Sequence, residues 1–210
     1  MGRNLSLTLY GHPDSGHVYK VALLLTVARL PYTYHVVDIF GPHAARHEEF
    51  RRHARYQQVP VLLIDGNSYV QSDAILCVLA EILGDFGGET PERMVLAREW
   101  LFWEANRLGM CLPQLRYARS FTMEGYNAGA LEWLQQRYDV DIARLDQEFR
   151  DGRAFILGEK PSIADFSLCG YLFHADQAKV TVPPGVTAWL SRMQALPGWR
   201  APYDLLAGTP

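Results

Sequence analysis

The 210-residue sequence has few cysteines, no long apolar run and no excess of one charge. Its three cysteines, Cys77, Cys111 and Cys169, are odd in number and lack Cys-x-x-Cys spacing, which excludes a disulfide framework and a zinc motif of that type. Cysteines used in this way indicate a reducing, cytoplasmic location. No segment approaches the length of a membrane-spanning helix, and the first seven residues lack the apolar core of a signal peptide. We therefore expect a cytoplasmic protein without a membrane partner.

Composition places the chain among ordinary globular proteins. Hydrophobic residues make up 49% and charged residues 20% of the sequence, which excludes disordered, collagen-like and coiled-coil chains. Twenty basic and 23 acidic residues give a net charge of −3, whereas a nucleic-acid-binding surface would require an excess of positive charge. The seven histidines show no paired-ligand spacing with acids on one helix, so we expect no metal site.

Two kinds of periodicity divide the chain. Up to residue 83, short strands with alternating apolar residues are interspersed with helices, and Asp65-Gly66 is typical of a hairpin turn. Residues 84–90 are rich in glycine and acid and form a candidate linker. From residue 91 to 210 only helical periods occur, beginning with Thr90 as a cap and Pro91 at the first helical position. We predict an α/β domain followed by an all-α domain.

Four segments carry a resemblance to a known family: residues 7–21, 58–62, 71–75 and 161–168. In this order and spacing the chain resembles the cytosolic glutathione transferase superfamily, and its serine type in particular. The resemblance implies a thioredoxin-like N-terminal domain, an all-helical C-terminal domain and a homodimer. It also implies glutathione as co-substrate.

Ser15 is the candidate catalytic residue. It lies between a predicted strand and a predicted helix, where unpaired N–H groups carry partial positive charge. A hydroxyl at that point can donate a hydrogen bond to a bound thiolate, and the resembled family uses a serine, tyrosine or cysteine for this purpose. Tyr10, at the end of the first strand, is the alternative, although a packed aromatic side chain is the simpler interpretation of Tyr10.

The resemblance also assigns residues that hold glutathione. Val59 and Pro60 match the junction whose cis peptide bond holds the cysteinyl part, because the bend exposes backbone groups to an added extended peptide. Gln71 and Ser72 match the pair that binds the γ-glutamyl group, with Ser72 also predicted to cap the following helix. Relatives commonly have glutamate at the position of Gln71, where it meets the substrate ammonium.

The glycyl carboxylate of glutathione would meet a basic residue of the segment that contains His43 and Arg46, and Arg46 could bind it bidentately. For each of these two residues, a solvated basic face is an equally good interpretation.

The electrophile pocket is assigned to the first long helix of the second domain, with Tyr10 added from the first. Its residues are Trp103, Asn106 and Met110. Ser162 and Asp165 form a capping-box pattern, which predicts a structural role in starting a buried helix.

These assignments predict a glutathione S-transferase that activates glutathione as a thiolate for attack on a small hydrophobic electrophile, as in detoxification. Two alternatives stay open. One is a glutathione-dependent peroxidase or disulfide reductase, and the other is a transferase-like protein that binds glutathione or apolar ligands without turnover.

Overall fold

The computed structural model describes residues 5–207, which form two compact units. The first comprises the residues up to Leu79 together with those from Pro197 onward, and the second is Ala80–Leu196. The division by sequence, at residues 83 and 91, differs mainly at the C-terminus, because the final residues belong to the first unit.

A mixed four-stranded sheet forms the centre of the first unit. Its strands are β1 (Leu7–Gly11), β2 (Thr33–Val36), β3 (Val61–Ile64) and β4 (Asn67–Val70), in the order β2-β1-β3-β4. β2 runs parallel to β1, whereas β1 and β3 are antiparallel, as are β3 and β4. Asp65 and Gly66 make the predicted hairpin turn, with φ values of 50° and 82°.

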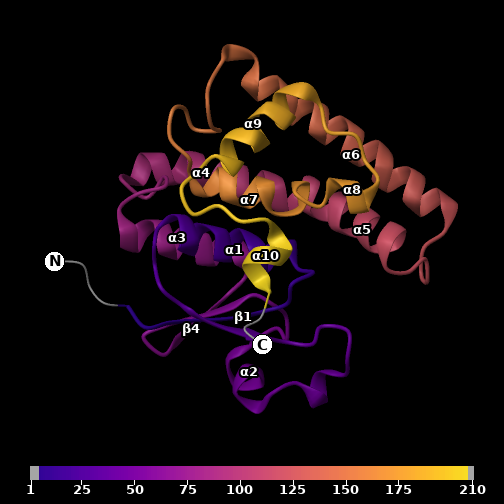
Figure 1. The fold of residues 1–210 in the computed structure, drawn as a ribbon. Coiled ribbons are helices and arrows are strands. Elements are labelled where there is room, and N and C mark those ends of the chain that lie inside the picture. Colours follow the sequence, from indigo (N-terminus) through magenta and orange to yellow (C-terminus); the bar gives the residue numbers. More distant parts are fainter. Residues whose placement is uncertain (1–4, 208–210) are drawn as a thin grey trace. The chain divides into compact units, whose positions relative to one another are not determined.

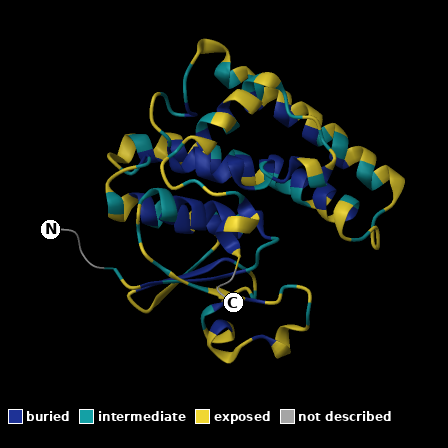
Figure 2. Ribbon diagram, viewed as in Figure 1, coloured by how far each residue is buried: buried dark blue, intermediate teal, exposed yellow. Residues whose placement is uncertain are grey.

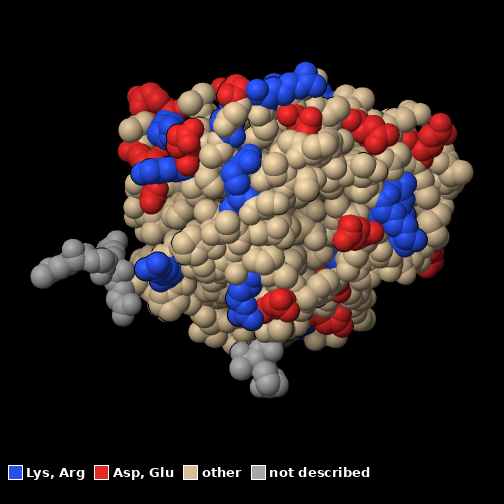
Figure 3. Space-filling view, turned by 45° about the horizontal axis from the view of Figure 1, so that its top comes forward, with Lys and Arg blue, Asp and Glu red and all other residues tan. Residues whose placement is uncertain are grey.

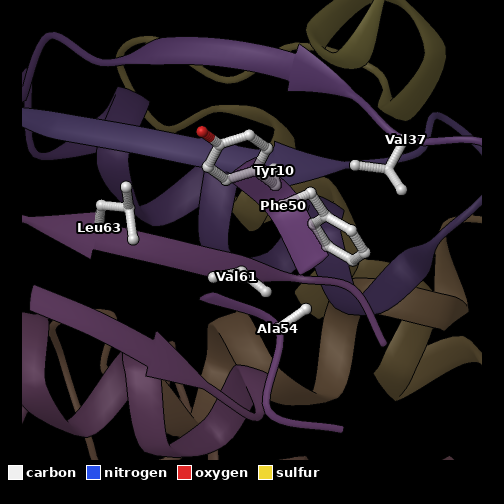
Figure 4. Close-up of a cluster of buried hydrophobic side chains, with 6 residues drawn as sticks. All are labelled: Tyr10, Val37, Phe50, Ala54, Val61 and Leu63. Carbon is white, nitrogen blue, oxygen red and sulfur yellow. The ribbon is translucent and has the colours of Figure 1, made fainter. Parts of the chain in front are cut away.

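Helices cover both faces of this sheet (Figure 1). α1 (Gly16–Val27) and α3 (Ser72–Leu83) lie on one face, and the short α2 (Glu48–His53) lies on the other. Phe50 of α2 and five further buried side chains form the apolar cluster of Figure 4; the others are Tyr10, Val37, Ala54, Val61 and Leu63. A single 3-10 turn, η1 (His43–Ala45), precedes α2. This arrangement confirms the predicted thioredoxin-like fold.

The last helix, α10 (Pro202–Leu206), packs on α1 and so returns the chain to the first unit. The Tyr19 hydroxyl of α1 donates a hydrogen bond to the Arg200 carbonyl at 2.9 Å, and Leu206 is fully buried. These contacts explain why residues beyond 196 do not belong to the helical unit to which the sequence assigned them.

The regular elements of the second unit are helices, as predicted, and one isolated β-bridge joins Phe155 and Gly158. Its elements are α4 (Pro91–Asn106), α5 (Leu108–Ser120), α6 (Ala128–Glu148), the 3-10 turn η2 (Phe149–Asp151), α7 (Ile163–Leu172), α8 (Ala175–Ala178) and α9 (Pro184–Gln194). Thr90 caps α4 by accepting from the Arg93 N–H at 3.3 Å, as its sequence predicts. The long helix expected after Pro91 is broken at Arg107, whose backbone (φ −121°, ψ −96°) is not helical.

α7 is the buried helix of this unit and is dark blue over almost its whole length in Figure 2. The predicted capping box is present at its start, where Asp165 accepts from the Ser162 N–H at 2.8 Å. The same carboxylate accepts from the Ser162 hydroxyl, the Ile156 N–H and the Trp189 indole N–H, each at 2.9 Å. Asp165 therefore joins three segments of the second unit.

Helix length and surface charge both agree with the sequence. None of the helices described between residues 5 and 207 is long and apolar enough to cross a membrane. On the face drawn in Figure 3, Lys and Arg side chains are interspersed with Asp and Glu side chains, a distribution that matches the balanced charge of the sequence.

Candidate functional site

Strand register brings three of the predicted segments to one edge of the sheet. Tyr10 lies opposite Val61, and Val61 lies opposite Val70. Because β1 and β4 end where β3 begins, the residues that follow β1, precede β3 and follow β4 all leave the sheet at this edge. Ser15, the Val59-Pro60 junction and the Gln71-Ser72 pair belong to these three segments.

Ser15 lies between β1 and α1, as predicted; it is the N-cap of α1 and is 6% exposed. Its N–H donates to the His12 carbonyl at 3.0 Å, and its Oγ accepts from the Val18 N–H at 3.2 Å. A hydroxyl can accept and donate at once, so capping is compatible with donation to a bound anion. Gly11 is required here, because a Cβ on it would lie 2.3 Å from Val18 Cγ1.

The start of α1 is a favourable place for an anion. The first N–H groups of a helix have no partner within the helix, and the helix dipole is positive there. Its first turn contains no acidic residue. Burial, with a smaller contribution from the neighbouring Lys20, lowers the pKa of His17 to about 3, although Asp73 acts in the opposite direction. His17 is therefore a neutral imidazole near pH 7.

A buried ion pair joins the two helices that begin at this edge. The Lys20 ammonium of α1 is fully buried and lies 2.9 Å from Asp73 Oδ1 on the first turn of α3. Sequence reasoning missed both residues, although a single lysine inside the apolar run of α1 was a detectable signal. The pair fixes the start of α3 relative to α1.

The Val59-Pro60 peptide bond is cis, as predicted from the resemblance. Pro60 directly precedes β3, where a residue without an N–H costs no ladder hydrogen bond. Among the described residues, no hydrogen bond involves the backbone N–H or C=O of Val59. These two groups can pair with an extended peptide laid along the edge.

Gln71 and Ser72 begin α3 in a way that differs from the prediction by one residue. The Gln71 carbonyl accepts from the Ile75 N–H at 3.0 Å, so Gln71 occupies the capping position and Ser72 is the first helical residue. Gln71 has a φ of 68°, in the left-handed region. Its side-chain amide donates to Gln58 Oε1 at 3.4 Å, and this contact ties the start of α3 to the residue before Val59. Ser72 is 8% exposed.

Arg46 and His43 differ in their surroundings. Arg46 is 8% exposed, and its guanidinium donates to the carbonyls of Asp38, Ile39 and Gln57. Arg46 thereby holds the loop after β2 against the turn before β3. His43, on η1, is exposed. The role of either residue in binding a carboxylate stays a prediction.

Tyr10 packs in the apolar cluster under α2 and is 3% exposed (Figure 4). Its ring stacks on His35 with centroids 5.1 Å apart. Burial raises the pKa of its hydroxyl, and Glu49 raises it further. This position favours the interpretation of Tyr10 as a packed aromatic and lends no support to a place in the electrophile pocket.

The other predicted pocket residues lie in the second unit, on both sides of the break at Arg107. Trp103 and Asn106 are on the last turns of α4, while Met110 is on α5 rather than on the same helix. Trp103 and Met110 are half-buried and Asn106 is exposed. The Trp103 ring meets the Trp100 ring edge-on, with centroids 5.4 Å apart.

The edge of the sheet therefore offers two helix starts, each with a serine, and an extended backbone segment between them. Such a set suits a short peptide that carries a thiolate and carboxylates. Among residues 5–207, no group of three or more His, Cys, Asp or Glu side chains is placed to hold a metal ion.

Comparison with known families gave two matches. Residues 9–85 match the family described as "Glutathione S-transferase, N-terminal domain", and residues 129–207 match "Glutathione S-transferase, C-terminal domain".

Three individual relatives illustrate the range of similar proteins. The disulfide-bond oxidoreductase YfcG of Escherichia coli K12 is 26% identical over 204 aligned positions, and the match covers 91% of this chain and 91% of its own. A glutathione S-transferase structure from Pseudomonas fluorescens Pf-5 is 28% identical, with a TM-score of 0.83 over 94% of this chain and 99% of its own. A glutathione transferase from Burkholderia graminis, with two glutathione molecules bound per subunit, is 23% identical, with a TM-score of 0.80 over 96% of this chain and 87% of its own.

Proposed function

Because the chain belongs to the glutathione S-transferase superfamily, we propose that it binds glutathione at the edge of its sheet and activates the thiol for attack on a hydrophobic electrophile. The observation that carries the proposal is the convergence of Ser15, Val59 and Ser72 at that edge. Substitution at an activated carbon or addition to an enone would be the reaction, and detoxification the setting.

Ser15 would act as a hydrogen-bond donor rather than as a nucleophile. A free thiol with a pKa near about 8.5 is only slightly ionised at neutral pH. Lowering that pKa by about two units, which corresponds to about 2.7 kcal/mol, leaves most of the thiol ionised. The Ser15 hydroxyl and the N–H groups at the start of α1 would stabilise the sulfur anion together.

The remaining residues of the edge would hold the peptide. Val59 would pair its N–H and C=O with the cysteinyl backbone beside Pro60. Ser72, at the start of a 12-residue helix, would meet the γ-glutamyl carboxylate, and Gln71 would accept from the ammonium.

His43 or Arg46 would meet the glycyl carboxylate. A guanidinium has five N–H groups, and Arg46 donates three hydrogen bonds to backbone carbonyls. The carboxylate would have to be met by its remaining N–H groups.

The electrophile would contact Trp103, Asn106 and Met110 of the second unit. The half-buried indole and thioether offer apolar surface, while the Asn106 amide offers a hydrogen bond. Tyr10, which the resemblance added to this set, is buried under α2 and would contribute only by packing.

Replacing Ser15 tests the proposal directly. Ser15→Ala removes one hydrogen bond to a charged group, about 1.5–3 kcal/mol, and should slow conjugation of an activated chloronitrobenzene by about 10–100-fold. The pKa of the bound glutathione thiol, read from the ultraviolet absorbance of the thiolate, should rise. Ser68→Ala, on the exposed part of β4, is the matched control. Unchanged turnover in Ser15→Ala would move the role to another group.

A second function has specific support from the 26% identity to a disulfide-bond oxidoreductase. In that reaction two glutathione molecules are oxidised to glutathione disulfide while a substrate disulfide is reduced to two thiols. A peroxidase would use the same thiolate on a hydroperoxide. Parallel assays with the chloronitrobenzene, bis-hydroxyethyl disulfide and cumene hydroperoxide separate the three. Glutathione binding without turnover of any of them would favour a non-catalytic binding protein.

We also propose a homodimer and a reducing, cytoplasmic setting in which reduced glutathione is available. Val95 and Phe102, one heptad apart on α4, are 55% and 74% exposed, and apolar exposure of this kind suits an interface. A monomer mass in sedimentation at micromolar concentration would refute the dimer.

A further inference from the structure

The C-terminal helix reaches the loop that carries Ser15. The Tyr203 hydroxyl of α10 donates to Asp14 Oδ1 at 2.6 Å, although the two residues are 189 positions apart in sequence. A hydroxyl bonded to a carboxylate at this distance is a short, charge-assisted hydrogen bond, which is among the stronger kinds in proteins. On sequence alone, no residue of the range 84–210 is assigned to thiol activation.

Asp14 is part of the turn that places Ser15. Its N–H donates to His12 Nδ1 at 3.1 Å, and the next N–H, that of Ser15, donates to the His12 carbonyl at 3.0 Å. The second oxygen of Asp14, Oδ2, lies 3.6 Å from the same Nδ1. Asp14 directly precedes Ser15, so a rearrangement of Asp14 would disturb the backbone that places Ser15.

The turn is also connected to the loop after β2. The His12 ring meets the Phe40 ring edge-on, with centroids 5.3 Å apart. Phe40 belongs to the loop that Arg46 holds through the carbonyls of Asp38 and Ile39. A contact made at Asp14 can therefore affect both loops beside the candidate thiolate position.

Tyr203 approaches the turn from a well-anchored segment. Leu205 and Leu206 are 9% and 0% exposed, and the Arg200 carbonyl accepts from the Tyr19 hydroxyl at 2.9 Å. Gly198, with a φ of 89°, lets the chain pass close to the Thr26 carbonyl, because a Cβ there would lie 3.1 Å from its oxygen. The phenol itself is on the outside, with the residue 42% exposed, yet its hydroxyl is held by Asp14.

We propose that Tyr203 is a positioning residue for thiol activation. By holding the Asp14 carboxylate it keeps the turn from His12 to Ser15 in the conformation that presents the Ser15 hydroxyl to the sulfur, which Tyr203 itself does not touch. This inference rests on the proposed role of Ser15 in binding a thiolate.

Tyr203→Phe removes the hydroxyl and keeps the ring, which makes it the decisive variant. We expect the thiolate fraction of bound glutathione, measured from its ultraviolet absorbance as a function of pH, to fall about 2–5-fold at neutral pH through a rise in the thiol pKa. Turnover of the chloronitrobenzene should fall by a similar factor, while KM for that electrophile stays unchanged. If the hydrogen bond between Tyr203 and Asp14 only stabilised the fold, Tyr203→Phe would change the melting temperature and leave the thiol pKa as it is.

Two further variants complete the test. Asp204→Asn changes an exposed neighbour on the same helix and should leave the thiol pKa unchanged. Asp14→Ala should raise the thiol pKa as Tyr203→Phe does, and the double variant should raise it no further, because both act on one contact.

The outcomes separate the two proposals. If the unaltered protein lowers the pKa of the glutathione thiol and Tyr203→Phe lowers it equally, the positioning role is refuted while the proposed function stands. If the unaltered protein does not lower that pKa at all, the proposed function is refuted and this inference with it.

Discussion

His17, on the first turn of α1, should make the protein lose stability as the pH falls below about 6.5. Burial holds the pKa of its imidazole at about 3, with Lys20 acting in the same direction and Asp73 against them. In the unfolded chain the same imidazole has its ordinary pKa of about 6.5. Between these values the unfolded state binds a proton that the folded state does not, so acid favours unfolding.

The size of the effect follows from the two pKa values. A pH of 5 lies about 1.5 units below the pKa of the unfolded imidazole, and each unit corresponds to about 1.4 kcal/mol. The free energy of unfolding should therefore be about 2 kcal/mol lower at pH 5 than at pH 7 because of this one group. The loss is about 0.7 kcal/mol at pH 6 and continues to grow until the pH reaches about 3.

Urea denaturation without glutathione, followed at pH 7, 6 and 5, measures this contribution when the protein is compared with His17→Asn. The variant should lose about 2 kcal/mol less stability than the unaltered protein over that interval. His43→Asn, which removes an exposed imidazole of the same unit, is the matched control. Equal slopes for the unaltered protein and His17→Asn would show that His17 titrates normally in the folded state.

Three more predictions concern single contacts. Asp165→Ala leaves buried donors without their shared carboxylate and should cost about 3–4 kcal/mol in urea denaturation; a loss under about 1 kcal/mol would contradict its joining role. Asp73→Asn takes the carboxylate away from a fully buried ammonium, whereas Lys20→Met leaves a carboxylate that is 23% exposed. The first should therefore be the more destabilising by at least about 1 kcal/mol, and the reverse order would refute this reasoning. Gln71→Glu should tighten glutathione binding about 3–10-fold in calorimetric titration at low salt, because a charged acceptor would meet the ammonium. Equal or weaker binding would show that the ammonium is already matched.

Local sequence signals were enough for most of the first unit. Alternating residues, the Asp65-Gly66 turn and the change from strand to helix around Ser15 each act over a few positions, so they could be interpreted without the fold. Tyr10 was harder, because β1 is buried on both faces: Leu9 is 0% and Tyr10 3% exposed. The burial of Tyr10 depends on Phe50 of α2, a contact between distant segments that no local pattern indicates.

The features that were missed depend on contacts between distant segments. Gln71 takes a left-handed φ without being glycine, and no local signal indicated that it would replace Ser72 as the cap of α3. The break at Arg107 falls on a residue with no intrinsic preference for ending a helix. The contact between Asp14 and Tyr203 joins opposite ends of the chain, where periodicity carries no information.

The return of the C-terminal residues has a consequence for biosynthesis. The 117 residues of Ala80–Leu196 interrupt the first unit in sequence. During translation, the strands of its sheet are therefore synthesised long before α10. At a translation rate of about 5–20 residues per second, that interval lasts about 6–23 s. During this time α1 lacks the contacts that α10 later supplies, and the turn from His12 to Ser15 gains its hydrogen bond to Tyr203 only after residue 203 has been synthesised. The unit whose synthesis begins first is thus completed after the second unit.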